Sequence, residues 1–295
     1  MFNLVASLFV VAMIVVAHSA VAQDVPADVI LKQGQSLVSL SEALSQIRPG
    51  TVVVLGEQHG TLEQASQQLQ IIENIKKNGH VVSVGFEFFE AQYQDLVDRW
   101  RGLEISEDDF LKGIHWGAGF PFSAYRQQAL FPQLNLGEHT VALNAKRTLT
   151  TKIASQGLAS LNDQERGELP EGFALGNQRY FSRFKSIMQE HLPTPEAIDR
   201  YFAAQSVWDD TMAFRANQFL AAHPEQVLVI IVGEFHVQYG GGLPDRLRAR
   251  GLSVTTFSLL NLQGLDSEEQ KNAVEPSAEY GSRADYIWTS RFGLQ

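Results

Sequence analysis

The chain alternates short apolar runs with longer segments of mixed polarity. Apolar residues, many of them β-branched, run almost without interruption at residues 52–55, 81–88, 140–144, 227–232, 253–259 and 284–289. Such runs are typical of strands that are buried on both faces of a parallel sheet. Helical spacing and capping signals predict helices at residues 61–78, 91–100 and 244–250. We therefore predict an α/β fold with a mainly parallel central sheet flanked by helices.

Two long segments interrupt this alternation because they carry no strand signal. They cover about residues 102–136 and 152–205, and they contain helical stretches such as residues 178–191. We expect both to be helical insertions that pack together above the carboxyl edge of the sheet and form a helical subdomain. The remainder of residues 23–295 is expected to form one α/β domain.

The first 22 residues have the pattern of a signal peptide. The segment carries no acidic side chain, Lys or Arg, and its apolar core at residues 5–17 is too short for a membrane span. A small-residue triplet of the A-x-A type ends at Ala22. We expect cleavage near Ala22 and export to the periplasm. No later apolar stretch is long enough to predict a transmembrane span.

The composition restricts the partners and the chemistry. The chain has no cysteine, so neither disulfides nor thiolate metal ligands are available. It has 33 acidic side chains against 23 Lys and Arg, a formal net charge of −10. Because nucleic acids and anionic membranes attract basic surfaces, this charge argues against both as partners.

Two near-identical tetrapeptides follow two of the predicted strands directly. They are Gly56-Glu57-Gln58-His59 and Gly233-Glu234-Phe235-His236. In open parallel sheets the carboxyl ends of the strands meet at one edge, where ligands bind. A third acidic residue, Glu87, lies within an apolar strand, where a carboxylate is costly to bury unless it is paired or binds a cation. We expect all three segments to meet in one crevice.

One hypothesis for this crevice is a metal-dependent hydrolase. His59, His236 and Glu87 would bind a divalent metal such as zinc, manganese or cobalt. Glu57 or Glu234 would then act as the general base on metal-bound water, for hydrolysis of an ester or peptide bond. The chain has no G-x-S-x-G elbow, no P-loop and no G-x-G-x-x-G motif, which disfavours nucleophilic and nucleotide chemistry.

A second hypothesis is haem binding. Residues 115–122 are rich in aromatic residues and glycine, and Tyr125 follows them. This stretch suits a flat apolar ligand, and it is equally compatible with a small core of the insertion itself. Tyr239 comes three residues after His236. Because a phenolate or an imidazole can be an axial ligand of haem iron, Tyr239, Tyr125 and His236 are candidate ligands.

At these residues the chain resembles the ChaN-like haem-binding family of the Tiki (TraB/erythromycin esterase-like) superfamily. Two GxxH motifs and a Glu on an intervening strand mark that superfamily, and His59, His236 and Glu87 match them. The resemblance extends over nearly all of the mature chain, through residues 87–116, 141–145, 157–170, 205–213 and 242–244. Many members carry histidine near the start of the first helix, where this chain has Gln64-Ala65.

The resemblance implies an α/β domain with a helical subdomain and a role in haem or iron uptake at the cell envelope. Related branches of the superfamily are metal-dependent hydrolases, so the enzyme remains an alternative. We predict an exported haem-binding protein without chemistry of its own. Tyr239 and Tyr125 are preferred to His236, because a phenolate suits ferric haem in an oxidising compartment. An exposed haem face would also favour a homodimer through the haem site.

Overall fold

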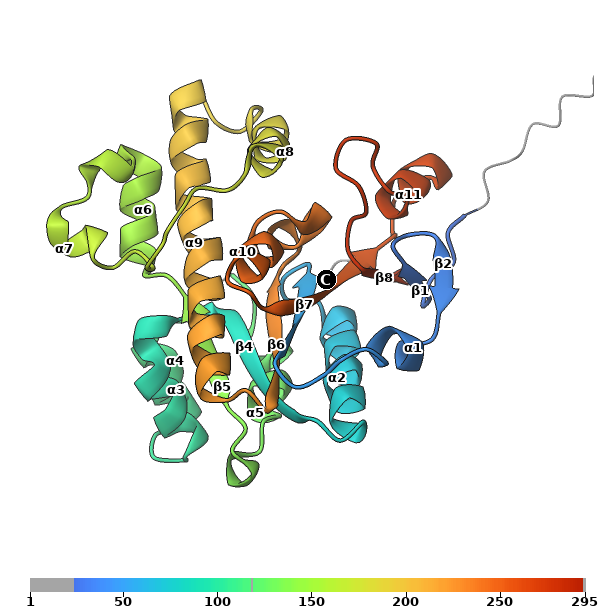
Figure 1. Cartoon of the computed structure of the whole chain (residues 1–295), viewed down its shortest axis with the longest axis horizontal. Coiled ribbons are helices and arrows are strands. Elements are labelled where there is room, and N and C mark those ends of the chain that lie inside the picture. The colour runs from blue at the N-terminus through green and yellow to red at the C-terminus, as the bar shows by residue number, and fades with distance from the viewer. Residues whose placement is uncertain (1–23, 118, 294–295) are drawn as a thin grey trace, which may run out of the picture.

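The computed structural model describes residues 24–117 and 119–293, so the predicted signal peptide lies outside the described residues. An eight-stranded sheet forms the centre of the molecule (Figure 1). Its strands are β1 (Ile30–Lys32), β2 (Ser36–Val38), β3 (Thr51–Glu57), β4 (Val81–Glu90), β5 (Thr140–Asn144), β6 (Gln226–Gly233), β7 (Ser253–Asn261) and β8 (Tyr286–Ser290). The order across the sheet is β2-β1-β8-β7-β3-β6-β4-β5. The strands from β8 to β5 are parallel, and β1 and β2 are antiparallel additions at one edge. The predicted mainly parallel α/β fold is confirmed.

One face of the sheet is covered by the helices of the first half of the chain. They are α1 (Leu40–Leu44), α2 (Leu62–Lys77), α3 (Gln94–Arg101), α4 (Glu107–Gly113) and α5 (Arg126–Leu130). Alternate strand residues such as Leu55, Val84 and Ile231 point to this face and join the largest apolar cluster. Side chains of the first insertion, among them Phe110 and Phe122, are part of the same cluster.

The opposite face is covered by two helices of the second half. The long helix α9 (Pro195–Ala222) begins at its N-cap Thr194, and α10 (Leu243–Ala249) follows β6. Small residues of α9, Ala213 and Ala216, pack on this face with Val54 of β3. Because both faces are covered by helices, the central strands are buried throughout, as their uninterrupted apolar runs indicate.

The second insertion builds its own small cores around the first half of α9. It contains the end of α6 (Arg147–Gln156), then α7 (Asp163–Arg166) and α8 (Gln178–Met188), which stand beyond the sheet in Figure 1. The two insertions were expected to pack together. Instead they face each other across a cavity at the carboxyl edge of the sheet. A last helix, α11 (Ser267–Val274), precedes β8. None of the helices described here is long and apolar enough to cross a membrane.

A test of the central sheet is the substitution Ile231→Ala. Ile231 lies on the interior strand β6, opposite Leu55 and Phe86, and its side chain is 0% exposed. The cavity left by the smaller side chain should lower the free energy of unfolding by about 2–5 kcal/mol in a denaturant titration. Leu103→Ala, at a side chain that is 90% exposed, should change it by less than about 0.5 kcal/mol. Equal effects of the two substitutions would contradict the placement of Ile231.

Candidate functional site

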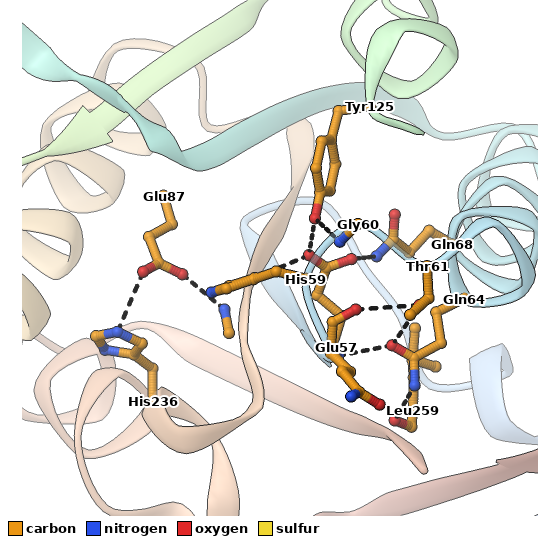
Figure 2. A network of polar contacts seen from close by, with 12 residues as sticks. Glu57, His59, Gly60, Thr61, Gln64, Gln68, Glu87, Tyr125, His236 and Leu259 are labelled. Atoms are coloured by element: carbon orange, nitrogen blue, oxygen red, sulfur yellow. Dashed lines mark hydrogen bonds and ion pairs between the residues drawn. The ribbon is translucent and has the colours of Figure 1, made fainter. Parts of the chain in front are cut away.

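The two GExH motifs lie side by side at the carboxyl edge of the sheet. Strands β3 and β6 are neighbours, and Glu57 is paired with Gly233 in the parallel register. Strand β4 lies on the other side of β6 and brings Glu87 to the same edge. Figure 2 shows His59, Glu87 and His236 turned toward one another. The predicted convergence of the three segments in one crevice is therefore observed.

Each motif's glycine makes room for a side chain of the other motif. A Cβ on Gly56 would collide with the carboxylate of Glu234, and a Cβ on Gly233 would lie 2.9 Å from Nε2 of His59. The role of these glycines is therefore steric. A residue with a Cβ at either position would prevent the backbone from approaching the facing side chain so closely.

An irregularity in β4 directs Glu87 into the site. The pairing of β4 with β5 shifts register between Phe86, opposite Ala142, and Glu90, opposite Asn144. Such irregularities bend a strand and change the direction of its side chains. The Glu87 carboxylate reaches across to β6, where Oε2 accepts a hydrogen bond of 2.6 Å from the Gly233 N–H.

His236 lies between two carboxylates. Its Nε2 is 3.3 Å from Oε1 of Glu87, and its Nδ1 is 2.6 Å from Oδ1 of Asp209 on α9. Asp209 also accepts a hydrogen bond of 2.9 Å from the hydroxyl of Tyr180. Burial lowers the pKa of His236, but the charges of Glu87 and Asp209 outweigh it and raise the pKa to about 10. His236 is therefore an imidazolium at neutral pH.

Glu87 is the anionic partner of this imidazolium. Burial raises the pKa of Glu87, but the charges of His236 and His59 and the Gly233 N–H lower it to about 2. The site thus contains a largely buried ion pair, with the Glu87 side chain 15% exposed, and its hydrogen bonds tie together β4, β6 and α9.

His59 is held by a second buried carboxylate. Its Nδ1 is 3.1 Å from Oε1 of Glu57, which is only 2% exposed. Glu57 also accepts hydrogen bonds from Gln68, at 2.5 Å, and from the hydroxyl of Tyr125. Burial raises the pKa of Glu57 against the effect of these donors. Burial lowers the pKa of His59, but Glu57 and Glu87 raise it overall.

His59 opens onto the cavity between the insertions. The cavity has a volume of about 980 Å³, and the His59 side chain is 38% exposed. One wall is aromatic, with Phe88, Tyr93, Trp116 and Phe120, whereas Trp208 of α9 packs on the α6 side. The facing wall is polar and comes from α6, with Arg147, Thr148, Thr151, Lys152 and Ser155.

The three predicted haem ligands lie in different environments. Tyr125 is buried, and its hydroxyl both donates to Glu57 and accepts the Gly60 N–H at 2.7 Å. Burial and the Glu57 charge raise the pKa of Tyr125, which opposes a phenolate. His236 is 5% exposed, and both of its nitrogens face carboxylates. Neither side chain is available to a ligand.

Tyr239 is separated from this site and lies on an open surface. It has a left-handed backbone with φ of 60°, and its N–H donates to the Arg283 carbonyl at 2.7 Å. Its ring lies 5.5 Å from the Tyr280 ring and 5.8 Å from the guanidinium carbon of Arg183. A second cavity of about 520 Å³ lies here, lined also by Ile187. We call this region, with Tyr239, Tyr280, Arg183 and Ile187, the Tyr239 surface.

The structure does not support the predicted divalent metal. Among the residues described, no three His, Asp or Glu side chains are arranged to hold a metal ion. His59, Glu87 and His236 do meet, but both nitrogens of His236 face carboxylates, Nδ1 toward Asp209 and Nε2 toward Glu87. Glu234 is held apart by Ser258 at 2.6 Å and Arg283 at 2.8 Å. Zinc, manganese and cobalt therefore have no site built for them in this part of the chain.

Several residues of the site were not predicted from the sequence. Asp209, Tyr180 and Gln68 come from helices and reach the sheet edge only through tertiary packing. The sole signal was a pair of acidic residues, Asp209 and Asp210, in a helix whose neighbouring positions are apolar. Gln64, where the resembling family carries histidine, is fully buried and bonds the Gln58 N–H at 2.6 Å and the Leu259 carbonyl at 2.7 Å.

The ion pair predicts how stability depends on pH. The raised pKa of His236 stabilises the fold fully below pH 6.5, and this contribution is lost as the pH rises through about 10. The lowered pKa of Glu87 contributes above pH 4.5 and is lost as the pH falls through about 2. His236→Gln removes the positive charge between Glu87 and Asp209 and should cost about 3–5 kcal/mol at pH 6.

Thermal unfolding of both proteins from pH 3 to pH 11 tests this expectation. The difference between wild type and His236→Gln should shrink toward both ends of the range. The exposed His191 supplies the control, because His191→Gln should follow the wild type at every pH. A difference that stays constant up to pH 11 would contradict the ion pair.

Comparison with solved structures finds this fold in a haem-binding protein, and two further structures superimpose less closely. A structure described as cofacial haem binding to ChaN of Campylobacter jejuni superimposes with a TM-score of 0.63 and 17% identity, covering 90% of this chain and 97% of that chain. The type III effector HopBA1 gives a TM-score of 0.46 and 11% identity, covering 82% of this chain and 88% of that chain. The erythromycin esterase EreC gives a TM-score of 0.43 and 12% identity, covering 76% of this chain and 72% of that chain. No curated protein matches the sequence.

A match to a protein-family model assigns the chain to a family. The model described as haem-binding uptake, Tiki superfamily, ChaN matches residues 43–247, which include both GExH motifs, Glu87 and Asp209. This match spans more than half of the chain, and the fold agrees with that of the C. jejuni protein. The chain belongs to the ChaN family of the Tiki superfamily.

Proposed function

We propose that this protein binds haem at the Tyr239 surface and acts in haem or iron uptake. Membership of a family described as haem-binding uptake supports the ligand, and so does the fold shared with a haem-binding protein. We choose the Tyr239 surface as the haem site because Tyr239 is accessible. Of the three candidate axial ligands, Tyr125 and His236 are buried and engaged, whereas Tyr239 lines an open cavity.

The surroundings of Tyr239 suit a ferric haem. A phenolate oxygen is a known axial ligand of haem iron. The Arg183 guanidinium lies beside the ring and is fixed by Gln238 at 2.9 Å and by the Phe235 carbonyl at 2.7 Å. Ile187, an exposed apolar side chain, offers contact to the porphyrin face.

Two further arginines suit the haem propionates. Arg179 and Arg248 line an adjoining hollow together with Tyr239 and Tyr280. Carboxylates bind arginine through charge-assisted hydrogen bonds. A haem bound in this way would leave one face open, and a second copy of the chain would cover that face. We therefore include a homodimer formed through the haem in the proposal.

Titration with hemin tests the site. We expect the purified mature protein to produce a Soret change that saturates at a defined stoichiometry, with a doubled molecular mass by light scattering. Tyr239→Phe removes the iron ligand and should weaken binding at least about tenfold, which corresponds to ~1.4 kcal/mol. Tyr201→Phe, at an exposed tyrosine of α9, is the matched control and should behave as the wild type.

Two results would refute this assignment. Saturating binding that Tyr239→Phe leaves unchanged would exclude Tyr239 as the ligand. Loss of the Soret change in Tyr125→Phe alone would move the haem to the buried tyrosine.

We also propose that the protein is exported to the periplasm after cleavage near Ala22. The uncharged apolar segment followed by a small-residue triplet supports this proposal. Mass spectrometry of the periplasmic fraction should find a chain that begins near Gln23. An intact Met1 recovered from the cytoplasmic fraction would contradict it.

A further inference from the structure

The hollow that adjoins the Tyr239 surface contains a buried arginine without an acidic partner. Arg183 of α8 is 4% exposed, and its guanidinium donates to two neutral acceptors, Gln238 and the Phe235 carbonyl. A guanidinium has five N–H donors, and a buried charge is costly unless it is paired. Among the described residues no carboxylate forms an ion pair with Arg183. The fold therefore leaves this cation with spare donors and without a compensating carboxylate.

The carboxylates that act on this guanidinium through their charge are committed to other cations. Asp209 lies 2.6 Å from Nδ1 of His236, and Glu234 accepts a hydrogen bond of 2.8 Å from Arg283. Burial lowers the pKa of Arg183, and the nearby acidic groups, Asp209 and Glu234 among them, offset this effect only in part. An anion in the hollow would supply the negative charge that these residues do not.

Two further arginines bring their charge to the rim of the same hollow. Arg179 is exposed, donates to the Glu279 carbonyl at 3.1 Å, and lies four residues before Arg183 on α8. Like charges with this spacing share one face of a helix and repel each other, so an anion beside them would stabilise α8. Arg248 lines the hollow from a second helix, α10, and is 3.7 Å from Asp285.

The charge and the size of the hollow match a phosphate group. Its volume is about 240 Å³, and the acidic residue of its described lining is Asp245, which accepts from Asn177 at 3.3 Å. Three arginines against this one carboxylate leave a local charge of +2, in a chain whose formal net charge is −10. A phosphate group carries about two negative charges at neutral pH. The hollow is therefore complementary to this anion, although the chain as a whole is acidic.

We propose that this hollow is an oxyanion site, which binds inorganic phosphate or the phosphate group of a small metabolite. Arg183 supplies the buried charge, and Arg179 and Arg248 form charge-assisted hydrogen bonds to the phosphate oxygens. Because the guanidinium groups come from two helices, they reach the oxygens of a tetrahedral anion from different directions.

The site also links haem binding to phosphate, a consequence that rests on the haem site proposed above. Arg179 and Arg248 cannot hold a phosphate and a haem propionate at the same time, so the two ligands compete. By mass action, the apparent dissociation constant for hemin rises in proportion to the phosphate that occupies the hollow. Haem is therefore released more readily where phosphate is abundant.

Isothermal titration calorimetry of the haem-free mature protein with phosphate, at an ionic strength held constant with sodium chloride, tests the site. The wild type should give a saturable heat with one phosphate per chain. Arg179→Gln and Arg248→Gln should each weaken binding about tenfold, and Arg183→Met should abolish it. Arg215→Gln is the matched control, because this exposed arginine of α9 bonds to Gln218 outside the hollow and should bind phosphate as the wild type does.

Glycerol 3-phosphate distinguishes the two sources of the phosphate group. Tighter binding of this ester would assign a metabolite, and tighter binding of inorganic phosphate would assign the free ion; either supports the site. A heat that does not saturate would overturn the proposal. So would binding that Arg179→Gln and Arg248→Gln both leave unchanged, and this test holds even if Arg183→Met fails to fold, which circular dichroism checks.

Hemin titrations with and without phosphate separate this inference from the haem site itself. Without phosphate, the Soret change of the wild type reports on the Tyr239 surface alone. With phosphate at ~10 times its dissociation constant, the apparent dissociation constant for hemin should rise about elevenfold. Arg248→Gln should need about tenfold more phosphate for the same effect. An unchanged hemin affinity would overturn the competition, whereas no Soret change in either buffer would refute haem binding and leave the calorimetric test of the hollow unaffected.

Discussion

The largely buried charge of Glu87 is the constraint on which the edge of the sheet depends. An unpaired carboxylate in this position would cost several kcal/mol, so the surrounding elements must supply its partners. Gly233 supplies a backbone N–H, His236 supplies a positive charge, and Asp209 keeps that histidine charged from the far side. Three elements, β4, β6 and α9, are thereby fixed relative to one another, and the long helix acquires a defined position over the sheet.

Much of this arrangement could be predicted from sequence, because strand ends in a parallel sheet meet at one edge. The apolar runs located the central strands, and the two motifs with Glu87 were correctly placed together. The partners of those residues could not be predicted. Asp209 and Gln68 reach the site from helices, and their contacts depend on helix rotation and register, which local patterns do not specify. Tyr125 was expected to be an accessible ligand, but its hydroxyl is used to position Glu57.

The aromatic residues of the first insertion have two roles, in the core and at the cavity. Phe110 and Phe122 complete the main core, whereas Trp116 and Phe120 turn toward the cavity. The segment therefore contributes to the main core of the sheet rather than to a core of its own, and two of its aromatic residues also line the cavity. Phe110 and Phe122 pack within the main core, whereas Phe120 lies beside the His59 ring and Trp116 packs on Phe120.

The two motif glycines, Gly56 and Gly233, determine which replacements the site can accept. Gly56 leaves space for Glu234, and Gly233 leaves space for His59, so the packing of each motif depends on the glycine of the other. A side chain added at either glycine would therefore first contact the other motif, although the two glycines are 177 positions apart in the chain. The two tetrapeptides therefore constrain each other sterically, because replacing either glycine forces the facing side chain of the other motif to move.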